Sequence, residues 1–163
     1  MKILISIASL FLTFTLFAQP ENGMRAMDFT LPNQKGNDVS LSDYEGDLIL
    51  LDFWASWCGP CRKENPNIVE AYSKYKDEKF TNGKHFKILS VFLDNKENAW
   101  KRAIKKDGLI WDHVWNKTRD VARKYGVRGI PYSFLIDGEG NIIAQGEELR
   151  GIGLHIEIEK YLK

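Results

Sequence analysis

The sequence predicts a mixed α/β fold in which helices cover both faces of a central mixed sheet. Two continuous apolar runs, Asp47–Trp54 and Phe86–Leu93, have the length and bulk of strands buried on both faces. Near the C-terminus, strand-like Tyr132–Ile136 and Asn141–Gln145 flank a turn of four residues, which predicts an antiparallel hairpin. Strand, helix, strand, then helix, hairpin and helix is an order typical of such a layered sheet.

Size and charge narrow the class of protein. The chain has 163 residues, 44% of them hydrophobic and 12% aromatic, which suits one domain with a substantial core and excludes a disordered chain. The formal net charge of +1 gives no general attraction to nucleic acid or acidic lipid, so we expect neither as a partner. We expect a monomer.

Residues 1–18 read as an export signal. A lysine near the start is followed by the apolar stretch Ile3–Phe17 and then the small residue Ala18. The stretch is shorter than the roughly 20 residues of a membrane span. We therefore expect cleavage after Ala18, a single domain over residues 19–163, and a periplasmic or other extracytoplasmic location. A large residue three positions before the cut leaves an uncleaved N-terminal anchor as the alternative.

The remaining elements follow from local patterns. Phe29–Leu31 and Asp38–Leu41 surround a Pro/Asn/Gly turn and predict an N-terminal β-hairpin, and a helical turn follows at Ser42–Glu45. From Gly59 the helical spacing of apolar residues predicts a long helix that ends at Asn82–His85. The inward face of that helix contains Cys61, Asn65, Ile68, Tyr72 and Tyr75.

The C-terminal half continues the alternation. A helix capped by Asp94 or Asn95 should run to about Lys106 and close at Asp107–Gly108, with a short strand at Trp111–Trp115. Thr118 should cap a short helix that ends at Tyr125–Gly126, and a last helix should span Ile152–Leu162. In the helix that should end near Lys106, the apolar face comprises Ala99, Trp100, Ala103 and Ile104. We expect Trp54, Trp100, Trp111 and Trp115 to serve packing.

The two cysteines, Cys58 and Cys61, lie between the buried strand that ends at Trp54 and the long helix that begins at Gly59. Gly59 and Pro60 open the helix, so Cys58 stands at its N-terminus, where the helix dipole favours a thiolate. Cys61 falls on the inward face. The pattern predicts an exposed attacking thiol at Cys58 and a buried resolving thiol at Cys61.

Three other uses of the cysteines are weaker. A structural disulfide across two intervening residues would remove little chain entropy. A zinc site would need more ligands, and His85, His113 and His155 are scattered without ligand spacing. A plain pair of buried thiols fits poorly with Gly and Pro between them. We expect no metal and no cofactor other than the Cys58–Cys61 disulfide itself.

The motif Trp57–Cys61 (WCGPC) resembles the thioredoxin superfamily, and its surroundings resemble the exported TlpA/ResA-like thiol–disulfide oxidoreductases with an AhpC/TSA-like N-terminal hairpin. The resemblance covers about Asp28–Leu162 and includes Pro66, which matches the family's helix-kinking proline. It implies a thioredoxin fold with a four- or five-stranded sheet and an insertion between Val91 and Trp115, before the cis-proline half.

The same resemblance implies a docking surface for a disulfide-bearing client. Ile130–Pro131 matches the family's cis-proline loop, in which the backbone of Ile130 pairs with the main chain of the client. Trp57, Gly59 and Pro60 surround Cys58 and complete the expected surface.

Two acids accompany the cysteines. Asp52 lies inside an apolar strand, where a carboxylate is costly, so it is a candidate proton acceptor for Cys61; thioredoxin carries an aspartate there. The alternative is a solvated strand edge. Glu64 lies one turn after Cys61 and matches a glutamate common in TlpA/ResA-like proteins, which implies tuning of the cysteine pKa. Its alternative is a surface ion pair with Arg62, Lys63 or Lys74. Which acid takes the proton stays open.

The predicted function is reduction of disulfides in exported proteins, apocytochromes among them, with a membrane thiol carrier as electron donor. The Gly–Pro pair resembles that of reducing thioredoxins, whose couple has a potential of about −270 mV. A peroxiredoxin-type peroxidase is one alternative, but Leu51 and Ala55 stand where its Pro and Thr belong. A binding or chaperone module with incidental thiols is the other.

Overall fold

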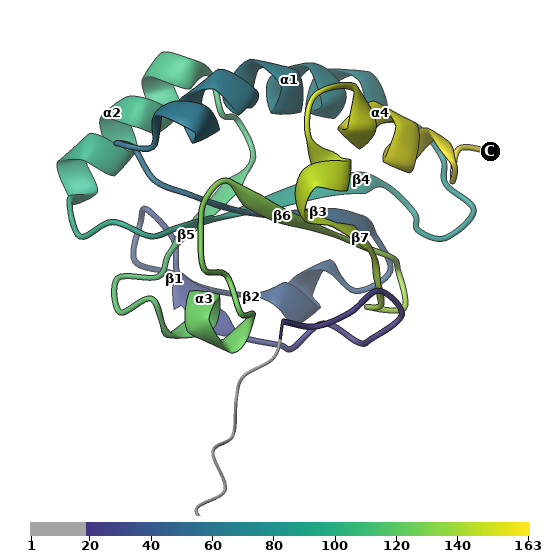
Figure 1. The fold of residues 1–163 in the computed structure, drawn as a ribbon, viewed down its shortest axis with the longest axis horizontal. Coiled ribbons are helices and arrows are strands. Elements are labelled where there is room, and N and C mark those ends of the chain that lie inside the picture. The colour runs from purple at the N-terminus through teal and green to yellow at the C-terminus, as the bar shows by residue number, and fades with distance from the viewer. Residues whose placement is uncertain (1–18) are drawn as a thin grey trace, which may run out of the picture.

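A computed structural model describes residues 19–163, so the predicted signal peptide lies outside the described residues. The central sheet has five strands in the order β5-β4-β3-β6-β7, with β3 parallel to β4 and antiparallel to β6 (Figure 1). The predicted mixed sheet with a C-terminal antiparallel edge is therefore confirmed. The strands are β3 (Leu48–Trp54), β4 (Phe86–Phe92), β5 (Asp112–Trp115), β6 (Tyr132–Ile136) and β7 (Ile142–Gln145).

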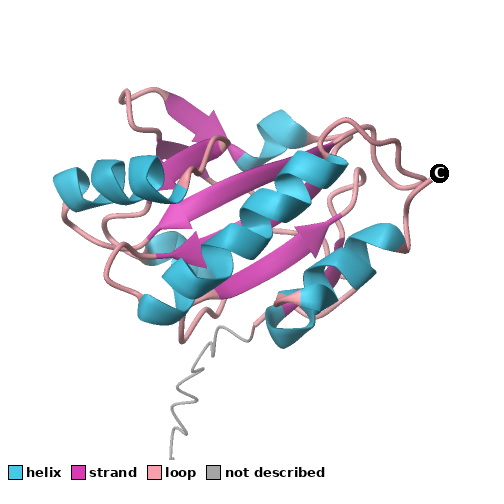
Figure 2. Cartoon of the chain, turned by 90° about the horizontal axis from the view of Figure 1, so that it is seen from above, coloured by secondary structure: helices cyan, strands magenta, loops and turns pink. Residues whose placement is uncertain are grey.

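Helices cover the two faces of the sheet unequally. In Figure 1, α1, α2 and α4 lie above the sheet, while α3, the hairpin β1–β2 and the helical turn η1 lie below it, and Figure 2 shows α1 crossing the sheet diagonally. These elements are α1 (Gly59–Tyr75), α2 (Glu97–Asp107), α3 (Asp120–Lys124), α4 (Ile152–Glu159), β1 (Thr30–Pro32), β2 (Asp38–Ser40), η1 (Leu41–Tyr44) and η2 (Gly146–Leu149).

The alternation of β3 divides the core into two halves. Leu48, Leu50 and Trp54 pack into the half beneath the three upper helices, with Tyr75 and Trp100 among its other members. Ile49, Leu51 and Phe53 pack into the opposite half, with Phe29 and Tyr125. All seven residues of β3 are buried, which is the reason why the sequence shows a continuous apolar run there.

Several predicted helix boundaries are wrong. α1 ends at Tyr75, before Asn82–His85, because the chain after it extends and Phe80 forms a bridge with Leu162. The same pairing ends α4 at Glu159. α2 is capped at Lys96, because the Asp94 carboxylate accepts hydrogen bonds from Ser56 and from the N–H of Asn95.

The short helix α3 also starts differently from the prediction. Its N-cap is Arg119, which has a left-handed φ of 59°, whereas the hydroxyl of the predicted cap, Thr118, donates to Asp120 inside the helix. Gly108 does end α2, as predicted, and it adopts the left-handed conformation there. The segment Val91–Trp115 contains α2 and the edge strand β5, so it adds a helix and widens the sheet.

Candidate active site

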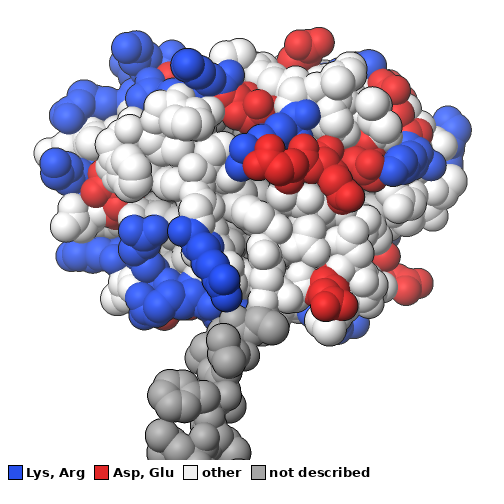
Figure 3. Space-filling view, viewed as in Figure 1, with Lys and Arg blue, Asp and Glu red and all other residues white. Residues whose placement is uncertain are grey.

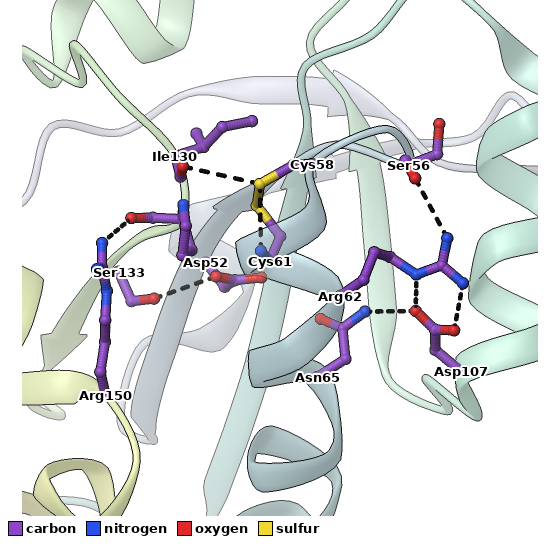
Figure 4. The surroundings of a disulfide bond; sticks show 11 residues. Asp52, Ser56, Cys58, Cys61, Arg62, Asn65, Asp107, Ile130, Ser133 and Arg150 are labelled. Atoms are coloured by element: carbon purple, nitrogen blue, oxygen red, sulfur yellow. Dashed lines mark hydrogen bonds and ion pairs between the residues drawn. A yellow bond between two sulfur atoms is a disulfide. The ribbon is translucent and has the colours of Figure 1, made fainter.

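Cys58 and Cys61 form a disulfide at the junction between β3 and α1, with an S–S distance of 2.05 Å (Figure 4). Cys58 is the N-cap of α1, and its sulfur accepts a hydrogen bond from the backbone N–H of Cys61 at 3.2 Å. Pro60 occupies the first turn, where its missing N–H costs nothing. The Cys58 sulfur therefore sits at the positive end of α1, which stabilises a thiolate once the disulfide is reduced.

The two cysteines are less unequal in exposure than predicted. Cys58 is 3% exposed and Cys61 1%, so the expectation of an exposed Cys58 is wrong for the disulfide form. The carbonyl oxygen of Ile130 lies 3.7 Å from the Cys58 sulfur and covers it from the side. The residues next to Cys58 are nevertheless accessible. Trp57, Gly59 and Pro60 are all exposed, and 62% of the Trp57 surface is accessible to solvent.

Asp52 lies in the middle of β3, and Figure 4 shows its carboxyl group next to Cys61, beneath the disulfide. It is 3% exposed and has a paired strand on each side, so the alternative of a solvated strand edge is wrong. Burial raises the pKa of Asp52 to about 7, and the charge of Glu64 adds to the rise, while hydrogen bonds from Ser133 and Ser90 oppose it. A carboxyl with this pKa can both accept and release a proton near neutral pH.

Ser90, Ser133 and Trp111 were not identified from the sequence. Ser133 donates to Asp52 Oδ1 at 3.1 Å and Ser90 to Oδ2 at 3.4 Å. The indole N–H of Trp111 donates to the Ser90 hydroxyl oxygen at 2.9 Å. Because an indole can only donate, the Ser90 hydroxyl has its own proton available for Asp52. The signal was present: each serine is a polar residue inside a buried strand, directly opposite Asp52 in the strand register.

His113 continues this row across the sheet, since it pairs with Ser90 in the register of β4 and β5. Burial lowers the pKa of His113 to about 3, so the ring is neutral. Its two nitrogens have no hydrogen-bond partner among the described residues. His113 therefore places no positive charge beside Asp52.

Glu64 is turned toward α4. Its Oε1 accepts hydrogen bonds from the N–H of Gly151 at 2.9 Å and from the side chain of Asn67 at 2.7 Å. Gly151 is the N-cap of α4, so Glu64 ties the first turns of α1 to the start of α4. None of the ion pairs found in residues 19–163 involves Glu64, so the surface pairs considered from the sequence are absent there.

The loop before β6 lies against Cys58, and the Ile130–Pro131 bond is cis, as the resemblance implied. No backbone hydrogen bond within residues 19–163 uses the N–H of Ile130. Arg150, which sequence reasoning missed, donates to the Pro131 carbonyl at 2.6 Å and holds the loop from the side of η2 (Figure 4). The loop thus offers a free main-chain donor next to the disulfide.

A second charged cluster lies on the other side of the disulfide. Arg62, one turn after Cys58, forms an ion pair with Asp107 at the end of α2 and donates to the Ser56 carbonyl at 3.2 Å. Asn65 donates to the same carboxylate at 2.7 Å. This cluster joins the first turns of α1 to α2. In the described part of the chain, no group of three His, Cys, Asp or Glu side chains could hold a metal ion.

Comparisons with known proteins agree with this geometry. Residues 22–145 match the AhpC/TSA family. The chain is 33% identical over 150 residues to the thiol-disulfide oxidoreductase ResA of Bacillus thuringiensis subsp. konkukian, covering 92% of this chain and 82% of that protein. A second ResA, from Bacillus cereus, is 34% identical over 143 residues, covering 88% of this chain and 78% of that protein.

Solved structures show the same likeness. The thioredoxin domain of a thiol-disulfide oxidoreductase from Bacteroides vulgatus superposes with a TM-score of 0.78 at 37% identity, covering 87% of this chain and 98% of that one. A thiol:disulfide interchange protein from Bacteroides sp. gives a TM-score of 0.76 at 38% identity, covering 86% and 89%. With its disulfide-forming cysteine pair on a thioredoxin fold, this chain belongs to the AhpC/TSA family and is a ResA-like thiol–disulfide oxidoreductase.

Proposed function

We propose that this protein reduces disulfides of exported proteins by cycling between a Cys58–Cys61 dithiol and the disulfide seen here. The observation that supports it most directly is the carboxyl group of Asp52, buried next to Cys61 and able to exchange a proton near neutral pH. A structural disulfide would have no use for such a group.

The reaction has two exchange steps. The Cys58 thiolate attacks one sulfur of the client's disulfide, a Cys58–client bond forms, and the other client sulfur leaves as a thiolate that takes up a proton. Cys61 then gives its proton to the Asp52 carboxylate and attacks the Cys58 sulfur. The Cys58–Cys61 bond forms and the second client sulfur leaves and is protonated. Two electrons pass to the client, which is reduced to a dithiol.

Asp52 is the better candidate for the proton acceptor, and Glu64 for a tuning role. Asp52 lies beside Cys61, whereas the Oε1 of Glu64 is occupied by Gly151 and Asn67. The charge of Glu64 nevertheless contributes to the raised pKa of Asp52. Glu64 therefore acts on the site through Asp52.

The client binds as an extended segment along the loop of Ile130 and Pro131. The free N–H of Ile130 can donate a hydrogen bond to a main-chain carbonyl of the client, so recognition there does not depend on the client's side chains. Trp57, Gly59 and Pro60 form the exposed surface on the other flank of Cys58.

The proposed location is outside the cytoplasm, reached through the signal peptide of residues 1–18. Among residues 19–163, no helix is long and apolar enough to cross a membrane. A reductant in an oxidising compartment has to be recharged, so a membrane thiol carrier is the proposed electron donor, and apocytochromes are among the proposed clients.

The decisive experiment is a Cys61→Ser trap expressed in the native compartment. Without the resolving thiol, the mixed disulfide between Cys58 and the client should accumulate and be recovered on a non-reducing gel. The Cys58→Ser variant is the control and should trap nothing. If both variants behave alike, a thiol-independent binding module is the better description.

The direction of electron flow has its own measurement. The Cys58–Cys61 couple should equilibrate with glutathione at a potential of about −270 mV, the thioredoxin value, and a value of about −120 mV would contradict a reductant. Peroxide consumption by the dithiol protein should be negligible, since Leu51 and Ala55 replace the Pro and Thr of the peroxidase motif.

A further inference from the structure

An open groove of about 410 Å³ lies beside the disulfide, and we call it the Trp57 groove. Ser56, Trp57 and Arg62 line it on the side of Cys58, and residues of α2 and the turn before it line the other side. Figure 4 shows Ser56 and Arg62 on the opposite side of the disulfide from Ile130. A client bound at Ile130 and joined to Cys58 therefore has this groove next to it.

The groove is strongly basic. Its charged side chains are Arg62, Lys96, Arg102 and Lys106, with Asp94 as the single acid. Within residues 19–163, Lys96, Arg102 and Lys106 take part in none of the ion pairs. Asp94 is already engaged, by the Ser56 hydroxyl at 3.3 Å and by the N–H of Asn95 at 2.7 Å.

The positive charge is local, because the whole chain has a formal charge of only +1. Both acids of α2 are paired: Glu97 with Lys101 at 2.6 Å, and Asp107 with Arg62. Within residues 19–163, the remaining cations of the helix, Arg102, Lys105 and Lys106, form no ion pair. Figure 3 accordingly shows blue side chains gathered over the position of α2 in Figure 1.

The walls of the groove are held in place. The Arg62–Asp107 pair joins α1 to α2, Asn65 donates to the same carboxylate, and Arg62 fixes the Ser56 carbonyl. Trp57 projects from the same loop with 62% of its surface exposed. A rigid basic groove with an exposed indole at its edge is suited to an acidic segment.

We propose that the Trp57 groove binds an acidic segment of the client, next in space to the cysteine that Cys58 attacks. This inference rests on the proposed function and adds a substrate preference to it. The unpaired cations speed the approach of an acidic client and orient its disulfide toward Cys58, since charges at the rim of an interface act mainly on the association rate.

The test uses the dithiol form of the protein and two synthetic disulfide peptides that differ only beside one cysteine, with three Glu in one and three Gln in the other. Oxidation of the protein is followed by tryptophan fluorescence in single turnovers. We expect the Glu peptide to react about tenfold faster at low salt, which is the lower end of electrostatic steering, and the preference to shrink at high salt.

The matched variants remove three charges each. K96Q/R102Q/K106Q should reduce the preference for the Glu peptide to less than about twofold, with the Gln peptide unaffected. K79Q/K84Q/K163Q removes lysines exposed beyond the far end of α1 and should keep the wild-type preference. Equal rates for the two peptides in the wild type, or an equal loss of preference in both variants, would overturn the inference.

Bis(2-hydroxyethyl) disulfide, which is small and neutral, separates this inference from the proposed function. If the wild-type dithiol reduces it but does not distinguish the two peptides, only the acidic preference is wrong. If the wild type reduces neither this compound nor either peptide, the proposed function is wrong and the preference falls with it. The groove variant should reduce the small disulfide at the wild-type rate.

Discussion

Asp52 is a carboxyl group that the fold keeps from ionising at the pH where an exposed carboxyl is fully charged. Its pKa rises from 3.8 to about 7 because the central strand buries it between two others. Between these values the folded state keeps a proton that the unfolded chain has released. The free energy of unfolding therefore falls as the pH rises through this window.

The variant Asp52→Asn has no carboxyl group to ionise, so it lacks this loss of stability at high pH. It should exceed the wild type in unfolding free energy by a few kcal/mol above pH 7, at about 1.4 kcal/mol per unit of pKa difference, and the gap should close toward pH 4. Urea unfolding of the two disulfide forms across this range measures it. A gap that is independent of pH would show that ionisation of Asp52 is not its cause.

Ser90 tunes the same carboxyl group. Its hydrogen bond to Asp52 lowers the pKa, so Ser90→Ala should raise the pKa of Asp52, by about one unit for a bond to a charged group. The pH dependence of the Cys61 resolving step, or the carboxyl carbon resonance of Asp52, reports the shift. Ser90→Thr keeps the hydroxyl and should restore the wild-type value; equal shifts in both variants would indicate altered packing instead.

At the scale of the elements, Glu64 has two roles that can be tested separately. It accepts a hydrogen bond at the contact between α1 and α4, and its charge raises the pKa of Asp52. Glu64→Ala leaves the N–H of Gly151 without its acceptor and should lower the free energy of unfolding by about 1–2 kcal/mol. Glu64→Gln keeps an acceptor oxygen and removes the charge, so it should retain most of the stability while lowering the pKa of Asp52.

Chemical unfolding together with the pH profile of the resolving step distinguishes these effects. A Glu64→Gln variant with an unchanged pH profile would leave Glu64 a purely structural role. The same variant unfolding as easily as Glu64→Ala would show that the carboxylate charge, rather than the acceptor oxygen, holds the start of α4.

The fold was largely predictable, because most of its helices and strands follow from the local spacing of apolar residues. The two apolar runs became β3 and β4, and the face of Cys61 and Ile68 became the buried side of α1. Helix ends were not predictable where a distant segment determines them. Phe80 leaves the helical pattern because it forms a bridge with Leu162, close to the C-terminus. Local propensity carries no information about such a pairing.

The site was predictable in its residue types and less so in its contacts. The burial of Asp52 followed from its apolar neighbours in sequence. Ser90 and Ser133, in contrast, come from other strands and meet Asp52 through the strand register, and Trp111 reaches the cluster only by donating to Ser90. For Glu64, the position on the helix was predicted correctly but its partner was not. The carboxylate accepts a hydrogen bond from the N–H of Gly151, which is 87 residues away in sequence.

For the whole molecule, burial predicts where the fold opens first. All of β3 is buried between β4 and β6, so its amides should exchange with solvent only on global unfolding. The strands of the hairpin β1–β2 are three residues each and partly exposed, so their amides should exchange orders of magnitude faster, through a local opening that denaturant barely affects. Native-state hydrogen exchange at several denaturant concentrations measures both. Phe29 and Leu41 anchor the hairpin in the core, so exchange from β1–β2 as slow as that of β3 would mean that these two side chains bind the hairpin into the same cooperative unit.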